Sequence, residues 1–124
     1  MPEPSERGAA AVEFAILLPL LVMLVLGIIE FGRAYNAQIT LTNAARDGVR
    51  VMAIGGDPTA ARTAAQNGAA SVSSTIPDSA ITLSPSACSP GNQVTLTINY
   101  TLSTITGIAG PFSMTGVGVM LCSG

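Results

Sequence analysis

The sequence contains no histidine and no tryptophan, and only two of its 124 residues are cysteines. Without histidine, nucleophile pairs of the Ser–His and Cys–His kinds are excluded, and a zinc site is not expected. Charged residues are scarce, and the net charge of −2 gives no sign of nucleic-acid binding. The few carboxylates form no catalytic constellation. We therefore expect a protein that is not an enzyme and that holds no cofactor and no metal.

What the sequence does contain is one long apolar segment near its start. Residues 14–29, between Glu13 and Glu30, carry no charge. At ~1.5 Å per residue, a helix over residues 9–29 is about 31 Å long, enough to span a hydrocarbon core of about 30 Å. Glu13 would then lie near the interface, where a carboxylate costs less than the ~2.5–3.5 kcal/mol of the bilayer centre. We expect residues 9–29 to form a transmembrane helix in contact with membrane lipid.

A cleaved secretory signal is the competing explanation of this segment. Such a signal has a basic start, a short apolar run and a cleavage site of the Ala-x-Ala kind after it. Here the start holds Glu3 and Glu6 against one base, Arg7, and no Ala-x-Ala follows Ile29. A helical pattern continues instead. The sequence therefore favours a membrane helix preceded by a polar leader, residues 1–8, which has no reason to be ordered.

The helix is expected to continue beyond the membrane segment. Apolar and small side chains recur every three or four residues, which places them on one helical face: Phe31, Tyr35, Ile39, Thr42, Ala45, Val49 and Met52. This face packs against the chain's own small domain or, in part, against other subunits. Gly55 and Gly56 end the helix, and Asp57 and Pro58 begin a second one over about residues 58–72.

From Ile81 the apolar period changes from 3.6 to 2, which predicts strands. The clearest covers residues 94–102, where alternate side chains are apolar, and shorter strands are expected at residues 81–83 and 116–122. Together these patterns predict an α+β fold, with a long N-terminal helix that extends into a small head made of a second helix and a three-stranded antiparallel sheet. The head and its helix would occupy residues 30–124.

The two cysteines lie in this second part of the chain. Cys88 falls in the loop between the first two expected strands, and Cys122 ends the third. In an oxidising space they can form a disulfide, which would close a loop of about 35 residues and contribute about 4 kcal/mol in the chain-entropy model. Two unpaired thiols in a reducing space are the alternative.

The N-terminus resembles the class III signals of the tight-adherence (Flp/Tad) pilus system, a type IV pilus system. In such signals a short leader ends in Gly, and Glu and an aromatic residue stand at the fifth and sixth mature positions before an apolar helix. Here Gly8 would end the leader, Ala9 would be the first mature residue, and Glu13 and Phe14 would be the fifth and sixth. The segment "AARDGVR" at residues 44–50 resembles the one that follows the membrane helix in TadE-like proteins.

The resemblance implies a pilin or minor pseudopilin that a prepilin peptidase cuts between Gly8 and Ala9. Glu13 and Phe14 would act in recognition and assembly. Its partners would be other pilin subunits and the pilus assembly platform in the cytoplasmic membrane. The C-terminal part would lie outside that membrane, and the assembled pilus would be extracellular. The resemblance leaves open whether this is a minor pilin or a main filament subunit with a head. The alternative function is a single-span membrane anchor that carries an extracytoplasmic binding or cell-adhesion domain.

Overall fold

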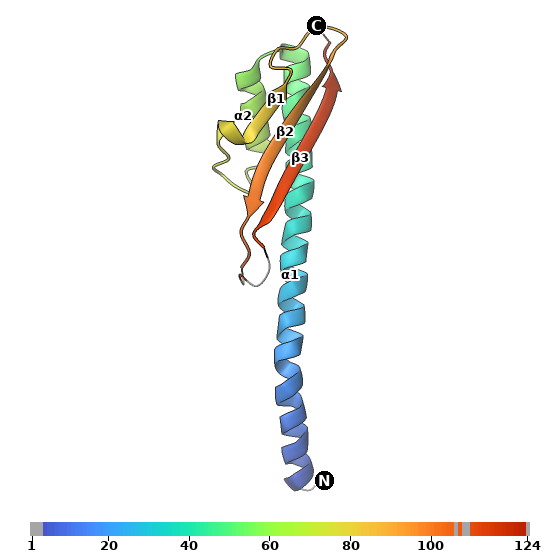
Figure 1. Cartoon of the computed structure of the whole chain (residues 1–124), viewed down its shortest axis with the longest axis vertical. Coiled ribbons are helices and arrows are strands. Elements are labelled where there is room, and N and C mark those ends of the chain that lie inside the picture. Colours follow the sequence, from blue (N-terminus) through green and yellow to red (C-terminus); the bar gives the residue numbers. More distant parts are fainter. Residues whose placement is uncertain (1–3, 106, 108–109, 124) are drawn as a thin grey trace. The chain divides into compact units, whose positions relative to one another are not determined.

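A computed structural model of the chain describes residues 4–105, 107 and 110–123. Its elements follow one another as α1 (Pro4–Gly55), α2 (Pro58–Gly68), a 3-10 turn η1 (Asp78–Ala80), β1 (Ile81–Ser84), β2 (Gln93–Leu102) and β3 (Phe112–Leu121) (Figure 1). The predicted α+β fold class is confirmed, since a long apolar helix, a second helix and a three-stranded antiparallel sheet are all present. The chain divides into two compact units, Met1–Arg33 and Ala34–Gly124, which are described separately.

The first unit contains the N-terminal part of α1. The helix runs through Pro19 as one uninterrupted element. Proline removes one backbone hydrogen bond from a helix interior. In membrane helices, neighbouring helices, ordered waters and local backbone adjustments can satisfy the freed carbonyl.

In the second unit, the C-terminal part of α1 and α2 cover one face of the sheet (Figure 1). The strand order is β1-β2-β3, and both neighbouring pairs are antiparallel. Ile81 lies opposite Ile98 between β1 and β2, and Tyr100 lies opposite Met114 between β2 and β3. Alternate residues of β2 point into the core, as the period of 2 predicted. The largest fully buried side chains come from α1 and β2: Leu41, Met52, Leu96, Ile98, Val49 and Val94.

Small residues allow α1 and α2 to approach each other closely. A Cβ atom on Gly48 would lie 2.9 Å from the carbonyl oxygen of Ala61, and one on Gly68 would lie 3.0 Å from Cα of Ala44. Ala65 is fully buried in the same contact. Because side chains at these positions are short, the two helix backbones meet with little conformational entropy lost from the side chains.

The predicted apolar face of α1 is only partly right. Val49 and Met52 are buried as expected, together with Ala45, but Tyr35 and Ile39 are exposed. The buried face is rotated toward residues that the predicted apolar face did not include: Ala37, Leu41, Ala44, Gly48 and Ala53. Packing against α2 and the sheet favours small side chains on this face, so size decides the orientation of the helix more than hydrophobicity does.

The ends of the other elements follow local chemistry. Asp57 caps α2 as predicted, because its Oδ1 accepts a hydrogen bond of 3.0 Å from the backbone N–H of Thr59. The helix ends at Gly68, earlier than the expected residue 72. Strand β3 begins at Phe112, before the expected residue 116, since β2 offers a partner along its whole length as far as Leu102.

Candidate functional site

The start of α1 lies within the expected leader. The helix begins at Pro4, so residues 4–8 are helical and the expectation of an unordered leader is wrong for them, while residues 1–3 lie outside the described part. Proline suits a first helical turn because its missing N–H needs no partner there. The negative charge of Glu6 interacts favourably with the positive end of the helix dipole. Gly8 and Ala9 therefore lie on helical backbone, and both are exposed.

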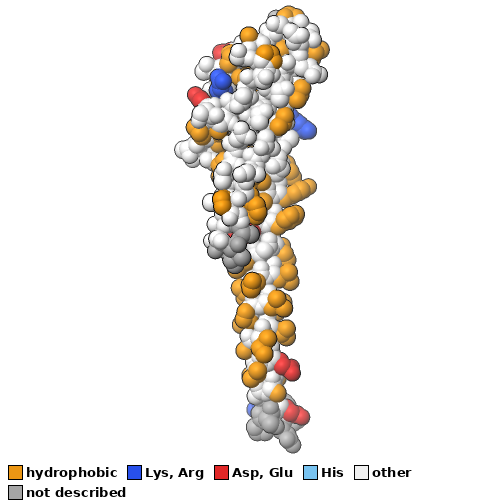
Figure 2. All heavy atoms as spheres, viewed as in Figure 1, with side chains coloured by type: hydrophobic (Ala, Val, Ile, Leu, Met, Phe, Trp, Pro, Cys, Tyr) orange, Lys and Arg blue, Asp and Glu red, His pale blue; other side chains and the backbone are white. Residues whose placement is uncertain are grey.

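The predicted membrane segment, residues 9–29, lies within α1, and its large apolar side chains are exposed: Val12, Phe14, Ile16, Leu17, Leu18, Leu20, Leu21, Val22, Met23, Leu24, Val25, Ile28 and Ile29. Figure 2 shows this N-terminal stretch of the helix covered by hydrophobic side chains. Of the helices described, α1 is the one long and apolar enough to cross a membrane. Such an exposed apolar surface suits lipid or other helices as its surroundings.

Glu13 is exposed at the N-terminal end of this apolar surface, directly before Phe14. Ala9 and Glu13 are four residues apart on α1, so they share one face of the helix. Helical side chains lean toward the N-terminus of the helix, which directs the carboxylate of Glu13 toward the turn that contains Ala9. A positive charge placed at the nitrogen of Ala9 would thus lie within reach of this carboxylate.

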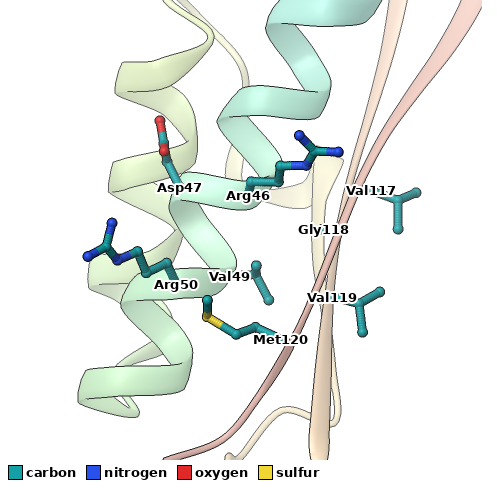
Figure 3. Close-up of a pocket in the computed structure, with 8 residues that line it drawn as sticks. All are labelled: Arg46, Asp47, Val49, Arg50, Val117, Gly118, Val119 and Met120. Carbon is teal, nitrogen blue, oxygen red and sulfur yellow. The ribbon is translucent and has the colours of Figure 1, made fainter.

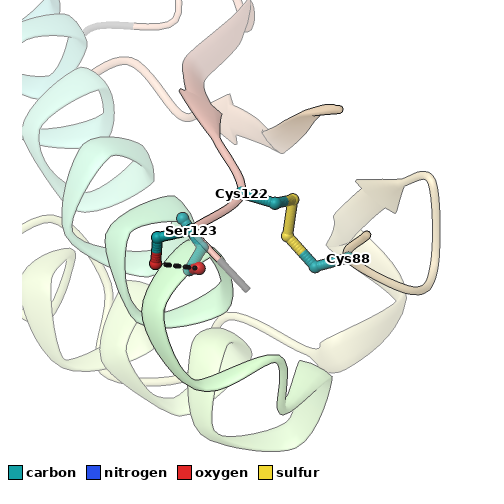
Figure 4. Close-up of a disulfide and its surroundings, with 4 residues drawn as sticks. Cys88, Cys122 and Ser123 are labelled. Carbon is teal, nitrogen blue, oxygen red and sulfur yellow. Dashed lines mark hydrogen bonds between the residues drawn. A yellow bond between two sulfur atoms is a disulfide. The ribbon is translucent and has the colours of Figure 1, made fainter. Parts of the chain in front are cut away.

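A disulfide and three hydrogen bonds hold the C-terminal end of β3 in the second unit. Cys88 and Cys122 are joined, with their Cα atoms 5.8 Å apart, a separation that suits a disulfide (Figure 4). The backbone N–H of Cys122 donates a hydrogen bond of 2.8 Å to the carbonyl of Asn92. The backbone N–H and the hydroxyl of Ser123 both donate to the carbonyl of Ala53, in the last turn of α1. The disulfide and the Cys122 bond thus tie the end of β3 to the β1–β2 loop, and the Ser123 bonds tie it to the end of α1.

Strand β3 forms one edge of the sheet, a position that the sequence pattern alone does not predict. Along the edge, the carbonyl of Thr115 accepts a hydrogen bond of 2.8 Å from Nε2 of Gln38 on α1. At the other edge, β1 has four residues, and the carbonyl of Ile81 accepts a hydrogen bond from Nε of Arg62. Strand β3 has ten residues, none of which is charged or a proline. Charged side chains and prolines are what usually protect a free edge strand from pairing with another chain.

A groove of about 490 Å³ follows this edge of β3. Its α1 side is formed by Arg46, Asp47, Val49 and Arg50, and its β3 side by residues 117–120. In Figure 3, Arg46 extends its guanidinium toward the side of β3, whereas Asp47 and Arg50 are turned toward α2. The sequence shows that residues 112–121 carry no charge, but only the strand order places this strand at an edge.

The described residues hold no group of three His, Cys, Asp or Glu side chains that could bind a metal ion. Their acidic side chains are spread over α1, the start of α2 and η1: Glu6, Glu13, Glu30, Asp47, Asp57 and Asp78. The exposed apolar surface of residues 9–29 is the one that the sequence predicted.

Comparison with known proteins bears on that N-terminal surface. Residues 8–50 match the model of the family described as TadE-like protein. Searches of curated proteins and of solved structures found no match. The matched residues begin at Gly8 and include Glu13, Phe14 and the segment 44–50, on which the resemblance rests. The resemblance predicted from the sequence is thereby confirmed: over residues 8–50, the N-terminal part of this chain is similar to the TadE-like family.

Proposed function

We propose that the chain is a TadE-like pilin or minor pseudopilin, which a prepilin peptidase cuts between Gly8 and Ala9 before it is assembled into, or at the tip or base of, a tight-adherence pilus. The observation that carries this proposal is the family match, which starts at Gly8 and covers the membrane segment. The exposed apolar surface of α1 supports it, because a subunit needs such a surface both in the membrane and among the helices of a filament.

Processing has to overcome the helix at the cleavage site. Because Gly8 and Ala9 lie in α1, the peptidase must unwind the first turns before it reaches the scissile bond. Gly8 lowers the cost, since glycine is about 1 kcal/mol less favourable than alanine within a helix. A Cβ on Gly8 would meet no other atom within 4 Å, so the need for glycine here lies with the peptidase rather than with the fold.

In the assembled state the head would lie outside the cytoplasmic membrane. The joined cysteines Cys88 and Cys122 suit that location, because disulfides persist in oxidising spaces outside the cytoplasm. The membrane platform would then draw the processed helix out of the bilayer and bring it into contact with other pilin subunits. A single-span anchor with a binding domain is the alternative, and it requires no cleavage.

Mass spectrometry of the protein extracted from its native membrane tests the proposal. With the peptidase present, we expect a chain that begins at Ala9, and without it a chain that retains the leader. Gly8→Val should block the cut through its branched side chain, whereas Gly27→Val, within the same apolar helix, should be cut normally. An intact leader in the presence of the peptidase would favour the anchor.

A further inference from the structure

The free edge of β3 presents unpaired backbone groups to the groove. The N–H of Cys122 bonds toward the β1–β2 loop, and in an antiparallel ladder bonds to one neighbour alternate along the strand. Residues 113, 115, 117, 119 and 121 therefore direct their N–H and carbonyl groups away from β2. The bond from Gln38 to the carbonyl of Thr115 agrees with this alternation. Gln38 thus covers the edge at Thr115, and the edge groups of Val117 and Val119 face the groove.

The groove lies along the edge itself. Its β3 lining includes Val117 and Val119, whose side chains are on the open face of the sheet, and Gly118 and Met120, which are on the face that α1 covers. Figure 3 shows Val117 and Val119 pointing away from α1, while Met120 points toward Val49. Because the groove reaches both faces of the sheet at the β3 edge, a further strand would fit into it beside β3.

We infer that this groove binds an extended, acidic segment of a partner protein, which adds to the sheet as a fourth strand beside β3. The backbone of the segment would pair with Val117 and Val119. Successive side chains of a strand point to opposite faces, so one set would lie beside Val117, Val119 and Leu121, which are exposed. The other set would face α1 and meet the guanidinium of Arg46.

These two surroundings define the chemistry of the segment. Apolar or β-branched side chains suit the open face, because Val117, Val119 and Leu121 offer apolar surface there. Carboxylates suit the α1 side, because Arg46 is exposed and is turned toward β3, whereas Asp47 is turned away. The ligand is thus an extended segment in which acidic and apolar residues alternate.

A second copy of this chain fits the groove less well. Residues 112–121 contain no acidic residue, so the β3 edge of another copy brings no carboxylate to Arg46. The β1 edge of another copy is short, and Arg62 already bonds to the carbonyl of Ile81 on it. Charge complementarity therefore selects a different, acidic partner. This inference goes beyond pilus assembly and does not depend on processing at Gly8.

Fluorescence anisotropy with the full chain in detergent micelles tests the inference. The probe is a labelled peptide of about eight residues that alternates glutamate and valine, a length typical of strand addition. We expect it to bind, and we expect a matched peptide that alternates lysine and valine not to bind. Equal binding of the two peptides, or binding of neither, would overturn the inference.

Two variants with the same change of charge locate the site. Arg46→Glu should weaken binding of the glutamate peptide by about tenfold or more, since it replaces attraction by repulsion. Arg50→Glu, one turn further along α1 and turned toward α2, should weaken it clearly less. Both residues are exposed, so both variants should fold. Equal losses would show an effect of net charge alone and would contradict the site.

Methylation of the peptide backbone tests strand addition without changing the protein. Only alternate N–H groups of an added strand face its neighbour. We therefore expect N-methylation of one set, either the valines or the glutamates, to abolish binding, and methylation of the other set to leave it. Equal effects of the two sets would exclude pairing with β3. Self-association that Val119→Lys abolishes, without peptide binding, would make a second copy the occupant and overturn the inference.

Discussion

Gly118 on β3 lies against the backbone of Ala45 on α1, where a Cβ atom on the glycine would be 2.6 Å from the carbonyl oxygen of Ala45. Real side chains do not come so close, so Gly118→Ala must push the sheet away from the helix. We expect this variant to lower the free energy of unfolding by about 1–3 kcal/mol, the usual cost of overpacking. Urea unfolding followed by circular dichroism measures the change.

Gly55→Ala is the matched control for this substitution. Gly55 is the last residue of α1, and a Cβ there would meet no atom within 4 Å. Alanine is a better helix former than glycine by about 1 kcal/mol, so this variant should be neutral or slightly more stable. If Gly118→Ala were as stable as Gly55→Ala, the close packing of β3 against α1 would be wrong.

Cys88 and Cys122 should form a disulfide in the exported protein. The double variant Cys88→Ser, Cys122→Ser should lose about 4 kcal/mol of stability, because the unfolded chain regains the entropy that the closed loop removed. Thiol labelling without reductant should modify neither cysteine, and labelling after unfolding and reduction should modify both. Full labelling of the unreduced exported protein would show that the bridge is absent.

Asp57 should stabilise the start of α2. Its carboxylate accepts a hydrogen bond from the backbone N–H of Thr59, so Asp57→Ala leaves that donor without its cap. We expect a loss of about 1 kcal/mol in the free energy of unfolding. Asp57→Asn is the control, since asparagine caps helices about as well, and its loss should be smaller. Equal losses would point to charge rather than to capping.

The strands could be predicted from the sequence because alternation is a direct consequence of strand geometry. Val94, Leu96 and Ile98 point to one face wherever the strand is placed, and the structure buries all three. The end of α1 was equally local, since Gly56 takes a positive φ of 68°, a backbone conformation that glycine adopts without strain.

Other features depended on contacts that the pattern of hydrophobicity does not encode. Tyr35 and Ile39 continue an apolar stripe, yet the sheet packs on Ala45 and its small neighbours because their backbone can be approached closely. Likewise, the groove beside β3 exists because that strand is an edge, which only the pairing order decides. The residues that carry the TadE-like resemblance at the N-terminus, Gly8 to Phe14, could be found because the resemblance lies in their spacing.

Glu13 should matter for assembly rather than for insertion. In a membrane-spanning helix over residues 9–29, Glu13 would stand near the interface. Replacing it by alanine removes a charged group, so Glu13→Ala should insert at least as well as the wild type. After cleavage, Ala9 carries a free amino group that is largely positive near neutral pH. Within a bundle of apolar helices, we expect the carboxylate of Glu13 and such an amine to form an ion pair. Burying a charge without a partner costs far more free energy than burying a pair.

The amine can come from the same subunit or from a neighbour. Ala9 and Glu13 share a helix face, so the own amine is in reach, while pairing with a neighbour's amine would also fix the axial register of the two helices. Removing one partner of a buried pair costs on the order of 3–5 kcal/mol. We therefore expect Glu13→Ala to lower incorporation into pili by about a hundredfold or more, since each 1.4 kcal/mol is tenfold.

The assay compares the inserted, processed and pilus-incorporated fractions of wild type, Glu13→Ala, Glu13→Gln and Glu13→Asp. Glutamine keeps the length of the side chain without its charge and should fail to assemble as alanine does. Aspartate keeps the charge on a shorter side chain and should retain part of the incorporation. A defect confined to processing would assign Glu13 to the peptidase instead. If Glu13→Ala and Glu13→Gln are incorporated like wild type, the carboxylate has no role in assembly. Contact with lipid head groups is then sufficient to explain a glutamate at this position.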